Sequence, residues 1–372
     1  MRLLDRYLMR ELLIPFSYCL SGFFVFWISF DLFAELADFQ KHKVKGLDIA
    51  EYYLVKTPEL LIVVLPVALL LALLYALTNL SRHHELTAIR AAGVSIWRMA
   101  IPYLVFGFIL SLGLFALNEL WVPDSARMAE EVLDRRSLVQ TNQPSKEWER
   151  KLGFTNTRQN RKWFMEAYNL RTHAMYHPYV EWTLTTGTRF VITAEWANYL
   201  NEQWVFTNVQ EQVFPPMQGA FPSMSSTNLL IMTQFSETPD EIQSEIKVGK
   251  IRSLREVKKA VLSIQEILAY KSLHSEDSAK NAMLDTKLYG RIAAPWTCLV
   301  VVLLALPFGA MTGRRNVYVG VASSLVICFF YFVLTQVMLA LGAGGYLPPL
   351  IAAWLPLALF AGGGIYATWL LQ

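Results

Sequence analysis

The sequence predicts an α-helical membrane protein with six transmembrane helices, three plus three, and an all-β, jellyroll-like domain inserted between helices 3 and 4. Three observations lead to this fold class. Hydrophobic residues make up 54% of the 372 residues and charged residues only 17%, whereas an average soluble protein is about 45–50% apolar with glycine included. The apolar excess lies in long uncharged runs towards the two ends of the chain. The middle of the sequence contains short strand-like runs instead.

Each predicted span is an apolar run close to the length of about 20 residues that a helix needs to cross a bilayer. The six runs are Leu12–Ala34, Leu60–Leu77, Met99–Leu117, Ile292–Ala310, Val317–Leu341 and Leu347–Leu371. Arginines precede the first run, as they do in a secretory signal peptide. That run is too long for a signal peptide, however, and no small-residue cleavage site follows it. We therefore expect an uncleaved first span.

The inserted domain is predicted to occupy residues 123–287, between the membrane segments 1–122 and 288–372. Its β-rich part, about 145–238, contains aromatic and β-branched runs at 161–167, 179–185, 189–196, 203–214 and 228–235, separated by turn residues. A helical connector is expected over 250–287. Its apolar positions recur at helical spacing, and they are Leu254, Val257, Val261, Ile264 and Leu268. Residues Pro123–Leu138 are expected to continue the third helix.

Basic residues in the short loops predict the orientation, because cytoplasmic loops are enriched in Lys and Arg. One side of the membrane would hold eight, namely Arg2, Arg6, Arg10, Arg82, Arg90, Arg98, Arg314 and Arg315. The other side would hold four, namely Lys41, Lys43, Lys45 and Lys56. Both termini are therefore expected in the cytoplasm and the inserted domain on the opposite side.

Charge and cysteine content argue against two other classes of protein. The net charge of +3 is too small to indicate nucleic-acid binding. The three cysteines, Cys19, Cys298 and Cys328, all lie in apolar runs. The inserted domain contains none, so no disulfide framework is predicted there.

The loop between the second and third spans, SRHHELTAIRAAGVSIWR (81–98), carries the strongest functional pattern. Ser81 is a candidate helix N-cap and Gly93 a candidate stop signal. Between them we expect a short helix over 81–93, with Ala88, Ala91, Ala92 and Ser95 on one side. Small residues there would let a partner surface approach closely, with Glu85 and Arg90 beside it. The simpler interpretation is that these two charges are only solvated.

At this point the sequence resembles the LptF/LptG family of lipopolysaccharide-export permeases. ELTAIRAAGVSIWR (85–98) is similar to the family's coupling helix. GRIAAPWTCLVVVLLALPFG (290–309) and LPPLIAAWLPLALF (347–360) resemble its fourth and sixth spans. WFMEA (163–167) and WVFTNV (204–209) resemble parts of its β domain. The resemblance covers nearly the whole chain and does not decide between the two paralogues.

The resemblance implies a permease subunit of an ATP-driven ABC transporter in the inner membrane, which passes lipopolysaccharide to periplasmic bridge proteins. In that family two permeases form a heterodimer. A cytoplasmic ABC ATPase dimer, which holds the ATP and Mg²⁺, binds their coupling helices. Lipopolysaccharide enters between the first span of one subunit and the fifth span of the other. The central domain would then be periplasmic. The ATPase-coupling residues would be Glu85, Ala88, Ile89, Arg90, Ala92 and Gly93.

Several residues remain open to a functional or a simpler interpretation. Lys41, Lys43 and Lys45 alternate, so in an extended segment they could face substrate phosphates together, or they could be ordinary loop lysines. Arg291 could contact substrate or the neighbouring subunit, or it could only snorkel to the interface. The acids Asp31 and Glu35 are expected to be solvated. The spacing of His173 and His177 suits a metal on a helix, but we expect no metal because the region reads as loop.

Two other classes of protein stay as alternatives. One is an ABC permease for other lipids or lipoproteins, which the three-plus-three layout disfavours. The other is a membrane-embedded lipid-modifying enzyme. His83, His84 and Glu85 form its only candidate cluster, and no catalytic arrangement stands out. The chain has no G-x-x-x-x-G-K-[ST] phosphate-binding segment, so ATP hydrolysis is expected in a separate subunit and no cofactor in this chain.

Overall fold

The structure of the chain is a computed structural model. It describes residues 3–41, 45–123, 148–184, 186–216, 221–249, 262–274, 278–309 and 317–370, together with 125, 128, 129 and 132. These residues contain six helices that are long and apolar enough to cross a membrane, three before and three after an antiparallel β domain in the sequence. The predicted fold class is confirmed.

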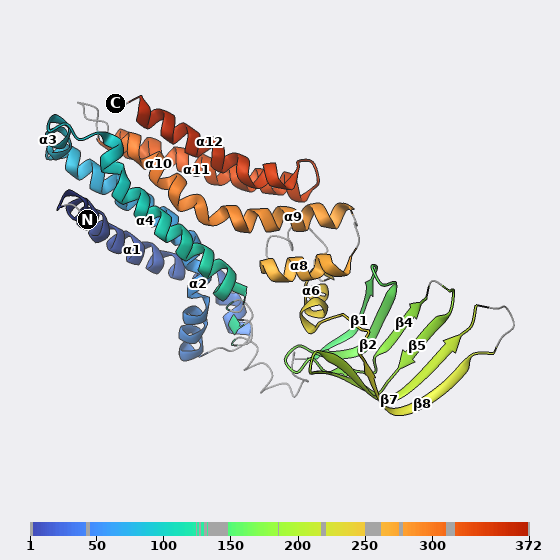
Figure 1. Cartoon of the computed structure of the whole chain (residues 1–372). Coiled ribbons are helices and arrows are strands. Elements are labelled where there is room, and N and C mark those ends of the chain that lie inside the picture. Colours follow the sequence, from blue (N-terminus) through green and yellow to red (C-terminus); the bar gives the residue numbers. More distant parts are fainter. Residues whose placement is uncertain are drawn as a thin grey trace. The chain divides into compact units, whose positions relative to one another are not determined.

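The spanning helices form a bundle (Figure 1). The first three are α1 (Leu3–Lys41), α2 (Gly46–Arg82) and α4 (Ile96–Ala116), which ends in the π-helical turn η1 (Leu117–Trp121). A short helix, α3 (Glu85–Ala91), joins α2 to α4. The fourth span consists of α9 (Ser278–Ala293), η2 (Ala294–Trp296) and α10 (Thr297–Gly309). The last two are α11 (Val317–Ala343) and α12 (Pro349–Trp369).

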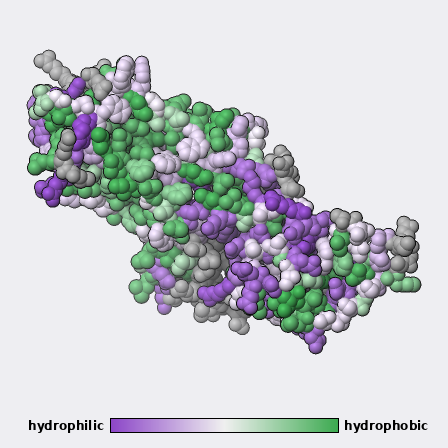
Figure 2. Space-filling view, viewed as in Figure 1, coloured by the Kyte–Doolittle hydropathy of each residue, from purple (hydrophilic) through white to green (hydrophobic). Residues whose placement is uncertain are grey.

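The helices of the bundle differ strongly in how deeply they are buried. In their most apolar stretches, 67% of α2 and of the α9–α10 span is buried, against 11% of α1 and 17% of α11. The space-filling view shows hydrophobic side chains over the visible face of the bundle (Figure 2). An apolar surface of this extent requires lipid or a partner to cover it, so α1 and α11 present the faces that other molecules cover.

Two glycines bring neighbouring helices into backbone contact with α10. A Cβ atom on Gly107 of α4 would lie 2.9 Å from Cγ2 of Val302, and one on Gly364 of α12 would lie 2.7 Å from the carbonyl oxygen of Leu303. Real Cβ atoms do not approach other atoms this closely. Small residues at such crossings are typical of membrane helix packing, and they fix α10 between α4 and α12.

The inserted domain is an antiparallel sheet whose eight strands follow one another along the chain. The strands are β1 (Trp148–Asn156), β2 (Arg161–Asn169), β3 (Met175–Tyr176), β4 (Tyr179–Thr183), β5 (Arg189–Thr193), β6 (Trp196–Leu200), β7 (Gln203–Phe214) and β8 (Ser223–Met232). β2 pairs with both β3 and β4 in one register, and β7 pairs with both β5 and β6. The sheet is therefore a meander in which β3–β4 and β5–β6 are two interrupted long strands.

A polar pair, Glu166 and His177, lies where the long strand β3–β4 is interrupted. The pairings of Ala167 with Tyr176 and of Phe164 with Tyr179 place Glu166 opposite His177. Nδ1 of His177 lies 2.8 Å from the carboxylate of Glu166. His177 has a left-handed φ of 46°. Bulky residues rarely adopt this conformation, so the backbone at His177 departs from strand geometry and interrupts the strand between β3 and β4.

The core of the inserted domain is aromatic and is completed by two helices. Trp163, Tyr168, Trp204 and Phe206 are fully buried in one cluster. Helices α6 (Pro239–Gly249) and α8 (Ile264–Leu273) contribute apolar residues to it.

Three sequence-based predictions about local structure were wrong in detail. Lys56 was expected in a loop, but it lies inside α2, which begins at Gly46 rather than near Leu60. In α8 the predicted face was out of phase, because Leu268 is 54% exposed and the buried residues are Ile267, Tyr270 and Leu273. Strands β1 and β6 were not recognised separately. The rest of the predicted connector face, Leu254, Val257 and Val261, and most of Pro123–Leu138 lie outside the described residues.

Candidate functional site: the α2–α4 loop and the ends of α1

The short helix predicted from the sequence is present as α3 and begins later than expected. α2 continues through Ser81 to Arg82, so Ser81 is not the N-cap of the short helix. His84 takes that position with a left-handed φ of 59° and makes no side-chain capping bond. The sharp change of direction at His84 separates α3 from α2. Figure 1 shows α3 at the end of the bundle where both chain termini lie.

The C-terminal end of α3 confirms Gly93 as the stop signal. Gly93 has a φ of +83°, and its N–H donates to the carbonyl of Arg90 at 2.9 Å. The N–H of Val94 donates to the carbonyl of Ile89 at 3.3 Å. This pair of bonds is the Schellman motif, which favours glycine at the left-handed position. The chain then turns directly into α4.

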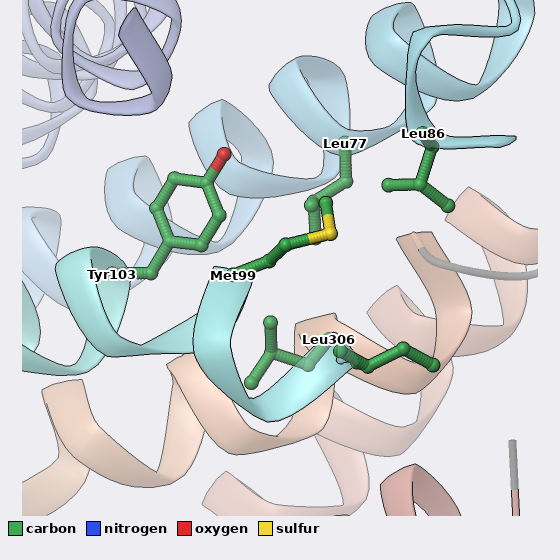
Figure 3. Close-up of a pocket in the computed structure, with 6 residues that line it drawn as sticks. Leu77, Leu86, Met99, Tyr103 and Leu306 are labelled. Atoms are coloured by element: carbon green, nitrogen blue, oxygen red, sulfur yellow. The ribbon is translucent and has the colours of Figure 1, made fainter. Parts of the chain in front are cut away.

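One side chain anchors α3 in the bundle. Leu86 is 1% exposed and lines a small apolar pocket between α2, α4 and α10 (Figure 3). The other lining residues are Leu77, Ile96, Met99, Tyr103 and Leu306. Burying a leucine side chain contributes about 1.5–3 kcal/mol. Because Leu86 packs against α2, α4 and α10, a displacement of α3 would disturb its packing against all three helices.

The opposite side of α3 is exposed and built from small residues. Thr87, Ala88, Ala91, Ala92 and Gly93 are all exposed, whereas Ile89 and Arg90 are partly buried. Ile89 packs against the bundle core. Ser95 does not share the helical face as predicted. It is the N-cap of α4, where its hydroxyl accepts from the N–H of Arg98 at 3.2 Å.

Two polar contacts join α1 to the ends of this loop. The hydroxyl of Tyr7 donates to Oε2 of Glu85 at 2.6 Å. The guanidinium group of Arg98 contacts both carboxylate oxygens of Asp5, at 2.8 Å and 3.1 Å. Bidentate arginine–carboxylate pairs have a defined orientation as well as strength. Glu85 was predicted from the sequence, but its partner Tyr7 and the pair of Asp5 with Arg98 were not.

The predicted basic site at the other end of α1 is only partly described. Lys41 is the last residue of α1, and Lys43 lies outside the described residues. Lys45 is exposed and immediately precedes α2, where its N–H donates to Asp48 at 3.0 Å. The three lysines thus fall at the connection between α1 and α2, and their role in substrate binding stays a prediction.

Arg291 is held by groups at the end of α4. Its guanidinium donates to the carbonyl of Asn118 and lies 3.5 Å from the carboxylate of Glu119. The side chains of Arg291 and Glu119 are only 14% and 18% exposed. The contact joins α9 to η1, and a role for Arg291 towards substrate also stays a prediction.

A third ion pair, which the sequence did not reveal, links α1 to α2. Nζ of Lys56 lies 2.9 Å from Oδ2 of Asp31. Lys56 also donates to the hydroxyl of Tyr52 at 3.0 Å, and Tyr53 donates to Asp31 at 3.1 Å. Asp31 was expected to be solvated, but its side chain is 19% exposed. Charges in membrane spans are normally paired in this way.

The histidines singled out from the sequence have other partners. His173 contacts Tyr168 and Gln243, each at 3.2 Å, and His177 pairs with Glu166. Among the residues that the structure describes, no group of three or more His, Cys, Asp or Glu could hold a metal ion.

Six helices of spanning length, a β domain between the third and fourth, and a short helix between the second and third define a multi-pass membrane protein of the permease type. The sequence model of the family described as lipopolysaccharide export system permease LptF/LptG matches residues 6–370, and the chain belongs to this family. A comparison with individually curated proteins gives no match.

Proposed function

We propose that this chain is one permease of an ATP-driven transporter that extracts lipopolysaccharide from the inner membrane and passes it to a periplasmic bridge. Membership of the LptF/LptG family carries the general role in lipopolysaccharide export. The exposed, small-residue face of α3, anchored through Leu86, supports the finer proposal that a separate ATPase dimer binds here. In this proposal α3 and both termini are cytoplasmic, and the inserted domain is periplasmic.

The bare apolar faces of α1 and α11 support a second permease as partner. Val25, Phe26, Phe30 and Phe33 on α1 are each more than 60% exposed, as is Phe329 on α11. In the proposed heterodimer, α1 of one subunit and α11 of the other border the opening through which lipopolysaccharide enters. The acyl chains of the substrate and the membrane lipids then cover these faces.

The basic residues near the outer ends of the helices are proposed to contact the phosphates of the substrate. Lysine binds phosphate as a point charge, and Lys45 is exposed. Replacing Lys41, Lys43 and Lys45 together by Ser should reduce substrate crosslinking to α1 without loss of the complex. Unchanged crosslinking would show that these lysines do not contact the substrate. Arg291→Gln tests the contribution of Arg291 to substrate binding in the same assay.

A native pull-down of the tagged chain in mild detergent tests the proposed function as a whole. Mass spectrometry of the co-purifying material should find an ABC ATPase, a second six-span permease and a bound glycolipid. Recovery of the chain alone, or together with lipid-synthesising enzymes, would contradict the transporter and favour a membrane-embedded enzyme.

A further inference from the structure

The two ends of the α2–α4 loop are both held by the first two turns of α1. Glu85 is the first residue of α3, and it accepts the hydroxyl of Tyr7 at 2.6 Å. Arg98 is in the first turn of α4, and it binds both oxygens of Asp5. Tyr7 therefore contacts the start of α3, and Asp5 contacts the first turn of α4, which follows it. We call these two contacts the α1 clamp.

Apolar packing joins the same part of α1 to the surroundings of α3. Leu8 and Leu12 are fully buried, and they belong to the same core cluster as Leu86. Beyond Phe16 the exposed apolar side chains of α1 dominate, and Val25 and Phe30 are 65% and 64% exposed. The helix is thus joined to the loop at one end. Farther along, one of its faces is exposed apolar surface, while the other, which includes Trp27 and Asp31, packs against α2.

We propose that Asp5 and Tyr7 are positioning residues that transmit displacement of α3 to α1. When an ATPase docks on α3 and shifts it, the clamp moves the attached end of α1 with it. Since α1 is one continuous helix from Leu3 to Lys41, this movement is carried along it and changes the position of its exposed apolar face. The inference rests on the proposed function, because it requires that α3 is the docking helix.

Glu85 would serve both the α1 clamp and the docking of the ATPase. Its carboxylate holds Tyr7, and it lies beside the exposed face at which the ATPase would dock. A cationic group of the ATPase that approached Glu85 would compete with the phenol of Tyr7 for the same carboxylate. Docking would then alter the clamp directly rather than only through rigid displacement of α3.

The first experiment measures lipopolysaccharide released per ATP hydrolysed by the native complex in proteoliposomes. Tyr7→Phe removes only the hydroxyl. The variant complex should retain the ATPase, and its release ratio should fall about fivefold, the order expected for the loss of one typical intramolecular hydrogen bond. The matched control is Tyr18→Phe. Tyr18 is on the same helix and 73% exposed, and its hydroxyl has no hydrogen bond to any described residue.

The charged half of the clamp is tested by exchange. Asp5→Arg and Arg98→Asp should each lower the release ratio, and the double variant should restore most of it because the pair is re-formed in reverse. A merely structural contact would change the yield of the complex without changing the ratio. Recovery in the double variant separates the pairwise contact from general damage.

A second measurement follows the clamp in the isolated chain. Nitroxide labels at Arg6→Cys on α1 and Thr87→Cys on α3, both at exposed positions, report the α1–α3 distance in a Cys19→Ala background. Tyr7→Phe should broaden that distance distribution. An equal distribution and an equal release ratio for Tyr7→Phe and Tyr18→Phe would overturn the clamp. Absence of an ATPase from the unmodified complex would overturn the proposed function instead.

Discussion

Gly309, the last residue of α10, packs its backbone directly against the side chain of Leu77 on α2. A Cβ atom built on Gly309 would lie 2.5 Å from Cβ of Leu77. Leu77 also lines the pocket that receives Leu86 of α3. This close contact of α2 and α10 thus lies next to the anchor of the short helix, and a change in the spacing of the two helices would alter the packing of α3.

The first prediction concerns this contact. Gly309→Ala should destabilise the bundle by about 1–3 kcal/mol, because an added methyl group in a packed interior forces its neighbours apart. Thermal unfolding of the chain in detergent measures the effect. Leu77→Ala in the same chain removes Cγ and Cδ1 but keeps Cβ, so it should relieve only part of the effect. The control is Gly113→Ala on α4, where an added Cβ would meet nothing within 4 Å. Equal effects of the two glycine substitutions would contradict the close contact.

The second prediction concerns the anchor of α3. Leu86 is almost completely buried, so Leu86→Ala should weaken its packing by about 2–5 kcal/mol. We expect faster hydrogen exchange of the α3 amide groups and lower recovery of the ATPase. Thr87→Ala, one residue farther along and exposed, is the matched control for the exchange rates. Wild-type exchange rates in the Leu86 variant would show that α3 is held by other contacts.

The third prediction concerns a buried ion pair in the inserted domain. The Glu237 carboxylate is fully buried and accepts from Arg161 at 2.5 Å, Asn156 at 2.9 Å and Trp163 at 3.2 Å. Removing one member of such a pair leaves an uncompensated charge and costs about 3–5 kcal/mol. Hydrogen exchange in β2 of the full chain should therefore accelerate strongly in Glu237→Gln.

The exposed pair of Glu166 with His177 provides the control for that experiment. Their side chains are 61% and 50% exposed, and an exposed pair contributes only about 0–1 kcal/mol. Glu166→Gln should leave exchange in β2 nearly unchanged. If both variants behave alike, the buried network around Glu237 does not stabilise the domain as we infer.

The fourth prediction concerns pH. Burial raises the pKa of the Glu245 carboxyl on α6 above its ordinary value of about 4.3, and the positive charges of His274 and Lys280 oppose this shift. A carboxyl whose pKa is raised on folding favours the folded state below its unfolded pKa, and this contribution is lost as the pH rises through the folded pKa. Protection of the α6 amides should therefore fall over that interval in the native chain.

Glu245→Gln, which cannot ionise, tests the cause of this fall. Its α6 protection should vary less between pH 4 and 7 than that of the native chain, so that the difference between the two grows with pH. A parallel decline in both proteins would assign the pH dependence to other groups.

The sequence was sufficient for the architecture because hydrocarbon length and strand alternation are both local signals. The runs around Leu69 and Val301 became buried spans, and Thr186-Gly187-Thr188 became a turn with Gly187 at a φ of +84°. Gly93 was also predictable, because the left-handed end of a helix favours glycine whatever surrounds it.

Contacts between distant parts of the chain could not be predicted in this way. Lys56 was placed in a loop because hydropathy marks only the apolar part of a helix, and its partner Asp31 is on another helix. Ser81 was taken as a cap because the backbone reversal at His84 has no composition signal of its own. Tyr7 could not be assigned to Glu85 either, because 78 residues separate them along the chain.

The most direct test of the central claim is photocrosslinking from Ala88 in native membranes. This residue lies on the exposed face of α3, and a photoreactive amino acid at this position should form an adduct with a nucleotide-binding ABC subunit, identified by mass spectrometry. The same probe at Tyr18, exposed along α1, should not. Adducts from Ala88 only with lipids, or with proteins that bind no nucleotide, would contradict the assignment of α3 as the ATPase-docking helix.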